Sequence, residues 1–107
     1  ALQGWMAYRA RRVVGMAVDG PLGVGVHVVW FHSPTCGPCR AMQPAIDALA
    51  STHPGLHPVD VTVDPALAAK LGVMATPTTV RVADGTVTAS RVGVMREAEL
   101  EAWLAPG

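Results

Sequence analysis

The sequence predicts an α/β fold with a mixed central β-sheet flanked by helices. Two observations support this class. Apolar runs of strand length alternate with segments of helical spacing along most of the chain, and the last two strand-like runs are joined by a short turn at Asp84-Gly85. Connections through helices make neighbouring strands parallel, whereas a hairpin makes them antiparallel, so the sheet should contain both kinds of pairing.

The first predicted elements are two strands. Residues 13–18 alternate irregularly between apolar and polar side chains and end at the turn Asp19-Gly20-Pro21. Residues 26–31 form a nearly continuous apolar run that is rich in β-branched side chains. Such a run is typical of a strand that is buried on both faces.

A long helix should follow from Cys36 to about Thr52, because Met42, Ile46 and Leu49 have helical spacing. Pro44 lies inside this segment. A proline removes one backbone hydrogen bond and crowds the preceding turn, so the helix should bend there.

The remaining segments alternate in the same way. The pattern predicts a strand at 57–63, a short helix through Leu67 and Leu71, a hairpin of strands at 78–83 and 87–92, and a last helix at 96–104. The predicted order of elements is therefore β, β, α, β, α, β, β, α.

The length of 107 residues suits a single domain, which we place at residues 13–107. Half of the residues are hydrophobic and 15% are charged, a composition typical of a compact globule. Eight Lys and Arg balance eight Asp and Glu, so no net charge draws the chain to nucleic acid, which we exclude as a partner. No uninterrupted apolar run is long enough to span a bilayer.

Residues 1–12 differ from the rest of the chain. Aromatic side chains precede Arg9, Arg11 and Arg12, so three of the eight basic groups fall within four positions. One interpretation is a solvated amphipathic lead-in. The other is the flank of a membrane tether upstream of Ala1, with aromatics at headgroup depth and arginines on the cytoplasmic side. The sequence leaves both open.

The strongest chemical signal is Cys36-Gly37-Pro38-Cys39, which stands where a buried strand ends and a helix begins. Two cysteines on one helical turn can close a disulfide, and the unpaired amides at a helix start favour thiolate over thiol. Cys36 should therefore be the attacking sulfur. Cys39, further into the helix, should be more buried and act second.

Two other interpretations of the cysteine pair are weaker. Inert buried cysteines would not need a Gly-Pro pair between them at a helix start. A structural zinc site needs about four ligands, whereas the histidines have no paired spacing. We interpret His27 as a half-buried strand residue, and His53 and His57 as solvated loop residues. We expect no metal and no bound cofactor.

The cysteine motif and four further features resemble the thioredoxin family, over about residues 24–104. Arg40 stands where a basic residue is usual, and Pro44 matches the proline of the active-site helix. The segment Met74-Ala75-Thr76-Pro77 resembles the loop whose proline is cis in that family, and Gly93 matches the glycine after its last strand. The resemblance implies a thioredoxin-like three-layer sandwich, with the backbone of Thr76 available to pair with an extended peptide.

The resemblance also implies an activity. Cys36 would attack a disulfide of a client and form a mixed disulfide, which Cys39 would resolve. The clients would be disulfide-containing proteins or small molecules, and an upstream electron donor such as a reductase would restore the dithiol. The substrate-binding groove would be formed by Thr35, Gly37, Pro38, Thr76, Pro77 and Gly93. We expect a monomer that works in the cytoplasm, at the membrane surface if a tether exists.

Four positions depart from the family pattern. Trp30 occupies the place of a buried acidic residue, and Pro58 occupies that of the lysine which accompanies the acid. His32 and Thr35 stand where tryptophans are usual, which makes the rim of the site smaller and more polar. His32 is a candidate for proton transfer, because an imidazole titrates near neutrality.

Three functions therefore stay open from the sequence. The leading one is a dithiol reductase, because a Gly-Pro pair between the cysteines resembles reducing members of the family. The second is a thioredoxin-fold binding module or membrane-tethered adaptor, in which the departures at Trp30 and Pro58 leave little redox activity. The third is a disulfide-forming oxidase.

Overall fold

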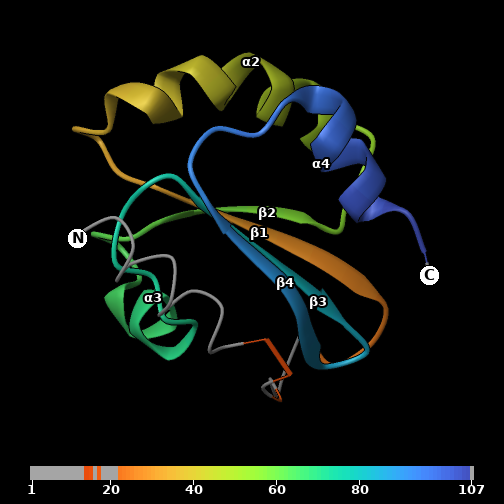
Figure 1. Ribbon diagram of the computed structural model, residues 1–107. Helices are drawn as coiled ribbons and strands as arrows, with labels where there is room; N and C mark the ends of the chain where they lie inside the picture. Colours follow the sequence, from red (N-terminus) through yellow and green to blue (C-terminus); the bar gives the residue numbers. More distant parts are fainter. Residues whose placement is uncertain (1–13, 16, 18–21, 107) are drawn as a thin grey trace.

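The computed structural model describes residues 14, 15, 17 and 22–106. The elements of this part of the chain are β1 (Val26–His32), α2 (Gly37–Ala50), β2 (Leu56–Asp60), α3 (Pro65–Lys70), β3 (Thr78–Ala83), β4 (Thr86–Val92) and α4 (Glu97–Leu104) (Figure 1). Strands and helices thus alternate early and a hairpin comes late, as the sequence predicts.

The four strands form one sheet in the order β2-β1-β3-β4. β1 and β2 are parallel, because α2 connects them. β3 runs antiparallel to β1 and to β4. The predicted mixed sheet is confirmed.

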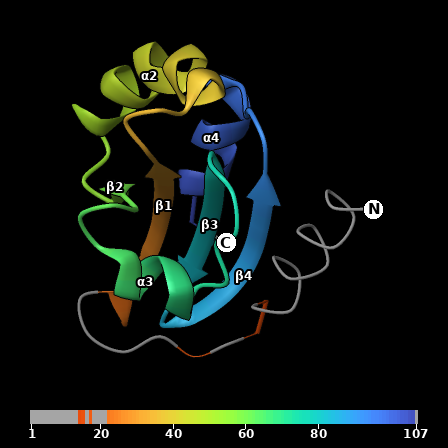
Figure 2. The ribbon, with the colours of Figure 1, turned by 90° about the vertical axis from the view of Figure 1, so that its left-hand side faces the viewer.

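Helices cover both faces of the sheet, with α2 and α4 on one side and α3 on the other (Figures 1 and 2). Successive side chains of a strand point to opposite faces. In β1, Val28 and Trp30 belong to the core under α2 and α4, whereas Val29 and Phe31 belong to the core under α3. All four are at most 1% exposed, so β1 is buried on both faces and the three-layer arrangement is confirmed.

Polar groups set the starts of two helices. The carboxylate of Asp64 accepts a hydrogen bond from the amide of Leu67 at 3.1 Å and caps α3. At α4 the carboxylate of Glu99 accepts the amide hydrogen of Arg96 at 3.1 Å. These local contacts satisfy amides that have no partner inside the helix.

The hairpin between β3 and β4 turns at Asp84 and Gly85, with φ of 48° and 81°. Positive φ at both central residues fits the turn that matches the twist of paired strands. Asp84 also holds the chain ahead of β1, since its carboxylate accepts the amide hydrogen of Gly25 at 3.0 Å.

Two predicted boundaries and one residue assignment differ from the structure. The strand predicted at 57–63 ends at Asp60, because the Asp60 carboxylate accepts hydrogen bonds from both the amide and the hydroxyl of Thr62 and turns the chain. The helix predicted from Cys36 to about Thr52 is α2, which ends at Ala50. His57 lies in β2 and is half-buried, so its interpretation as a solvated loop residue is wrong.

The first predicted strand, at residues 13–18, lies partly outside the described residues. Val14 and Gly15 form a turn, and Ala17 makes an isolated antiparallel bridge with Thr86. The lead-in at residues 1–12 lies wholly outside the described residues. Within the described part of the chain, no helix is long and apolar enough to cross a bilayer.

Candidate active site

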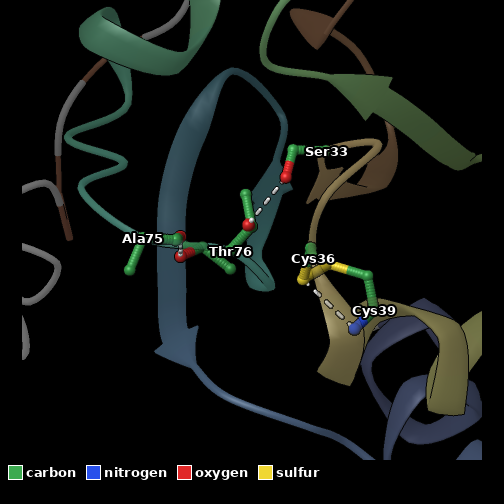
Figure 3. The surroundings of a disulfide bond; sticks show 6 residues. Ser33, Cys36, Cys39, Ala75 and Thr76 are labelled. Carbon is green, nitrogen blue, oxygen red and sulfur yellow. Dashed lines mark hydrogen bonds between the residues drawn. A yellow bond between two sulfur atoms is a disulfide. The ribbon is translucent and has the colours of Figure 1, made fainter.

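The two cysteines lie at the start of α2 and are joined by a disulfide, with an S–S distance of 2.12 Å and a Cα–Cα distance of 5.3 Å (Figure 3). Cys36 is the N-cap of the helix. Its sulfur accepts a hydrogen bond from the backbone amide of Cys39 at 3.2 Å. The Cys36 sulfur therefore occupies the position at which a helix start stabilises negative charge.

Both cysteines are buried, with 7% of Cys36 and 4% of Cys39 exposed. Thr35, Gly37 and Pro38 next to them are exposed. Small exposed residues on either side of Cys36 leave room for another chain to approach its sulfur. On the inner side the cysteines pack in the core cluster under α2 and α4, which includes Trp30, Met42 and Met95.

A second segment lies beside the disulfide. The Thr76–Pro77 peptide bond is cis, and the carbonyl of Pro77 accepts the amide hydrogen of Gly93 at 2.9 Å. The hydroxyls of Thr76 and Ser33 are 3.4 Å apart, and Figure 3 shows them facing each other next to Cys36. Three separate loops thus meet at the disulfide, and they bring together residues predicted for the groove.

The sequence model of the thioredoxin family, described simply as Thioredoxin, matches residues 23–106. The chain belongs to the thioredoxin family. It is 34% identical over 77 residues to a Staphylococcus aureus thioredoxin, which covers 69% of this chain and 74% of that protein. It is 29% identical over 92 residues to a Rhodospirillum rubrum thioredoxin, covering 83% of this chain and 84% of that protein.

Solved structures agree with this assignment. A mutant thioredoxin from Halobacterium salinarum superposes with a TM-score of 0.69 at 30% identity, covering 81% of this chain and 84% of that one. The thioredoxin of Fasciola hepatica gives a TM-score of 0.66 at 34% identity, covering 78% and 81%. Thioredoxins exchange dithiols and disulfides, and this chain carries its cysteine pair at the start of α2. It is a thiol–disulfide oxidoreductase.

This thioredoxin-family chain has no carboxylate at the expected place beneath its disulfide. Trp30 is fully buried in the same core cluster as both cysteines. Its partner across the parallel strands β1 and β2 is Pro58. The two departures from the family pattern are therefore neighbours in space. Neither side chain can take up and release a proton as a carboxylate or an amine does.

His32 lies at the end of β1, where its ring stacks on Trp30 with centroids 4.6 Å apart. Within the described residues its side chain makes no hydrogen bond to either sulfur. Proton transfer by His32 would therefore need an intervening water. That role stays a prediction.

Sequence reasoning missed part of the site. A pocket of about 230 Å³ adjoins the Thr76 loop and is lined by Val61, Ala68, Val73, Met74, Ala75 and Thr76. Met74, which lines this pocket, is almost half exposed, so the rim carries more apolar surface than the replaced tryptophans suggest. Only the loop residues could be found from a motif, because sheet and helix packing bring the others to the pocket.

The side chains that could bind a metal ion are scattered over the described part of the chain. No group of three or more His, Cys, Asp or Glu side chains that could hold a metal ion occurs in the described part of the chain.

Proposed function

We propose that this chain reduces disulfides of client proteins through the dithiol form of Cys36 and Cys39. The observation that carries the proposal is the position of Cys36. This residue is the N-cap of α2, and its sulfur accepts a hydrogen bond from the Cys39 amide at 3.2 Å. The partial positive charge of a helix start favours the thiolate, which is the form that attacks a disulfide.

The reaction balances with the two cysteines alone. The Cys36 thiolate attacks one sulfur of the client disulfide, that S–S bond breaks, and the other client sulfur leaves as a thiolate that takes up a proton. Cys39, as a thiolate, then attacks the Cys36 sulfur and releases the second client sulfur. The client gains two electrons, and the chain returns to the disulfide form described above. An electron donor of the dithiol or reductase class must then reduce it again.

Client docking would use the backbone of Thr76. Its amide and carbonyl make no hydrogen bond within the described residues, and it lies beside the disulfide. An extended client segment can pair with such a free edge, which would hold its sulfur near Cys36. The groove proposed for this segment is lined by Thr35, Gly37, Pro38, Thr76, Pro77 and Gly93, with the adjoining pocket open to an apolar client side chain.

A first experiment measures the activity by insulin reduction with dithiothreitol, followed as turbidity. The wild-type chain should accelerate the reaction, and Cys36→Ser should reduce the rate to that of dithiothreitol alone. Equal rates for wild type and Cys36→Ser would contradict the proposal.

A second prediction separates the roles of the two sulfurs. Cys39→Ser keeps the attacking thiol and removes the resolving one, so a mixed disulfide with the client should accumulate. Non-reducing electrophoresis followed by reduction measures it. Cys36→Ser is the matched control and should trap no client. If Cys36→Ser traps client as well as Cys39→Ser does, the assignment of roles is wrong.

The direction of exchange is tested by equilibrating the dithiol with glutathione buffers. A reductase should have a midpoint nearer to about −270 mV, the value of thioredoxin itself, than to the oxidising end near about −120 mV. A midpoint above about −180 mV would instead favour a disulfide-forming oxidase.

A second candidate function is a binding module with weak redox activity. The observation that favours it is the pairing of Trp30 with Pro58, which puts two side chains that do not titrate where the family pattern has an acid and a lysine. Such a module would bind clients through the groove but would fail the insulin assay.

The monomeric state and the place of work are also proposals. We propose a monomer, and light scattering after size exclusion should give a mass of about 11.1 kDa for this chain.

A cytoplasmic site of action at a membrane surface is supported only by the basic and aromatic residues at 1–12. Fractionation of cells that produce the full reading frame tests it.

A further inference from the structure

Two histidines meet at the end of the sheet opposite the disulfide. His27 lies near the start of β1 and His57 lies in the edge strand β2. Their rings stack with centroids 5.0 Å apart, and Nδ1 of His27 is 2.9 Å from Nε2 of His57. Both residues are half-buried, so solvent and solutes reach them.

A backbone carbonyl decides which nitrogen of His27 is available. Nε2 of His27 is 2.7 Å from the carbonyl oxygen of Val24. A carbonyl oxygen only accepts hydrogen bonds, so Nε2 carries the proton and Nδ1 of the neutral ring has a lone pair directed toward His57. Histidines that bind metals are usually oriented in this way, by a hydrogen bond from the other ring nitrogen to a carbonyl or carboxylate.

His57 completes the pair through a hydrogen bond. Because Nδ1 of His27 accepts, Nε2 of His57 donates the hydrogen in the 2.9 Å contact. A metal ion would replace this hydrogen, because the proton of a neutral imidazole can sit on either ring nitrogen, and its shift to Nδ1 of His57 makes Nε2 a ligand.

The two nitrogens are close enough to bind one ion. With metal–nitrogen bonds of about 2.0–2.1 Å, two adjacent ligands of a square-planar or octahedral ion lie about 2.9 Å apart, whereas two ligands of a tetrahedral ion lie about 3.3–3.4 Å apart. The 2.9 Å between His27 and His57 is the length of their hydrogen bond, and a ring rotation of a few tenths of an ångström accommodates either arrangement, so the nitrogen ligands themselves select the ion. Cu²⁺ and Ni²⁺ adopt such geometries with nitrogen and oxygen ligands, and Cu²⁺ binds the more tightly.

We propose that His27 and His57 form a two-histidine site for Cu²⁺, with Ni²⁺ as a weaker ligand. A small rotation of the rings would turn both lone pairs toward one ion, and water would fill the other coordination positions. No third His, Cys, Asp or Glu of the described residues joins them, so the site is open and the ion exchangeable. A bound ion would tie the edge strand β2 to β1.

The experiment is a calorimetric titration of the chain with Cu²⁺, with the Cys36–Cys39 disulfide intact so that no thiol competes for the metal. His27→Gln and His57→Gln should each weaken binding at least about tenfold, because the remaining imidazole is a single ligand. His53→Gln is the matched control, since it also removes one imidazole and leaves the pair intact. Electron spin resonance should show two nitrogen ligands on Cu²⁺ in wild type and one in each variant of the pair.

Thermal unfolding gives an independent readout. Ni²⁺ should raise the Tm of wild type and of His53→Gln, and it should leave the Tm of His57→Gln unchanged, because a ligand of the folded state stabilises it by mass action. Equal Cu²⁺ affinity in wild type and His57→Gln would overturn the proposal, as would tighter binding of Zn²⁺ than of Cu²⁺. If His27→Gln does not fold, His57→Gln in the edge strand carries the test alone. Insulin reduction without metal should be equal in wild type and both variants.

Discussion

Two adjacent threonines of β3 should respond to the same substitution with opposite signs. Thr79 is fully buried, and its hydroxyl has no hydrogen-bond partner within the described residues. Thr78 is 1% exposed, and its hydroxyl donates to the carbonyl of Ala75 at 2.6 Å. Thr79→Val keeps the shape and removes an unsatisfied polar group, so the free energy of unfolding should rise by about 1 kcal/mol. Thr78→Val should lower it by about 1–2 kcal/mol.

Urea unfolding of wild type and the two valine variants measures both effects. The comparison controls for the loss of a hydroxyl from a buried strand, because the two residues are neighbours and only their partners differ. A lower stability for Thr79→Val would mean that its hydroxyl binds an internal water.

His32 allows a test of proton transfer at the same scale. Its ring stacks on Trp30, so a role at the sulfurs requires a water between them. If His32 exchanges a proton with Cys36, the pH profile of Cys36 alkylation by iodoacetamide should change in His32→Ala. If the profiles of wild type and His32→Ala coincide, His32 has no role in proton transfer and only packs on Trp30. A lower urea midpoint of His32→Ala would then measure the loss of this stacking contact.

At the scale of elements, Arg81 links β3 to the end of α4. Its Nε donates to the carbonyl of Trp103 at 2.7 Å, and one terminal nitrogen donates to the carbonyl of Ala105 at 3.0 Å. A cation at a helix C-terminus satisfies carbonyls that have no partner inside the helix. Arg81→Met keeps much of the apolar stem and should lower the free energy of unfolding by about 1.5–3 kcal/mol.

Arg81→Lys is the matched variant for that prediction. Lysine keeps the charge but cannot donate to two carbonyls through a planar fork, so its stability should fall between wild type and Arg81→Met. Denaturant unfolding followed by the tryptophan fluorescence of the chain measures the series. Equal stability of all three chains would mean that α4 is held by its apolar contacts, with Leu100 fully buried, and not by Arg81.

Elements that depend on local sequence patterns could be predicted from the sequence. Strand β1 and the turn at Asp84-Gly85 are examples, since an apolar run and a turn with positive φ each depend on local chemistry. The end of β2 could not be predicted in this way. The side chain of Asp60 folds back on Thr62, and this contact gives no signal in the hydrophobic pattern.

The same distinction applies to the site. The dithiol and the Thr76–Pro77 loop are local motifs, and they were found from the sequence. Ser33 beside Thr76 was not found, because the contact joins residues 43 positions apart. The meeting of His27 with His57 depends in the same way on the pairing of β1 with β2, so histidines without paired spacing in the sequence are neighbours in the fold.

At the scale of the whole molecule, the sheet keeps the histidine pair and the disulfide apart. β1 carries His27 near its start and leads into Cys36 past its end, so the histidine pair and the disulfide lie at opposite ends of the same strand. Within the described residues, no hydrogen bond or ring contact joins the histidine pair to the disulfide. A change at the histidine pair should therefore act on stability and metal binding, while thiol exchange continues.

The stability of the whole chain should fall in two stages as the pH decreases. Burial, and then His27, lower the pKa of His57 from its ordinary 6.5, so the unfolded chain binds more protons than the folded chain. This contribution is fully present above about pH 6.5 and is lost as the pH falls through the lower folded value. Hydrogen bonds, from Thr62 to Asp60 and from the Arg96 amide to Glu99, lower the pKa of both carboxyls. Their contributions are lost only below about pH 4.

Urea midpoints measured between pH 8 and 3 test this order. His57→Gln should remove the decrease that begins below about pH 6.5 and keep the one below about pH 4, because glutamine does not titrate and the carboxyls are unchanged. His53→Gln should keep both decreases. If the upper decrease persists in His57→Gln, another group must take up the proton, and the stacked pair would have no part in the acid sensitivity of the fold.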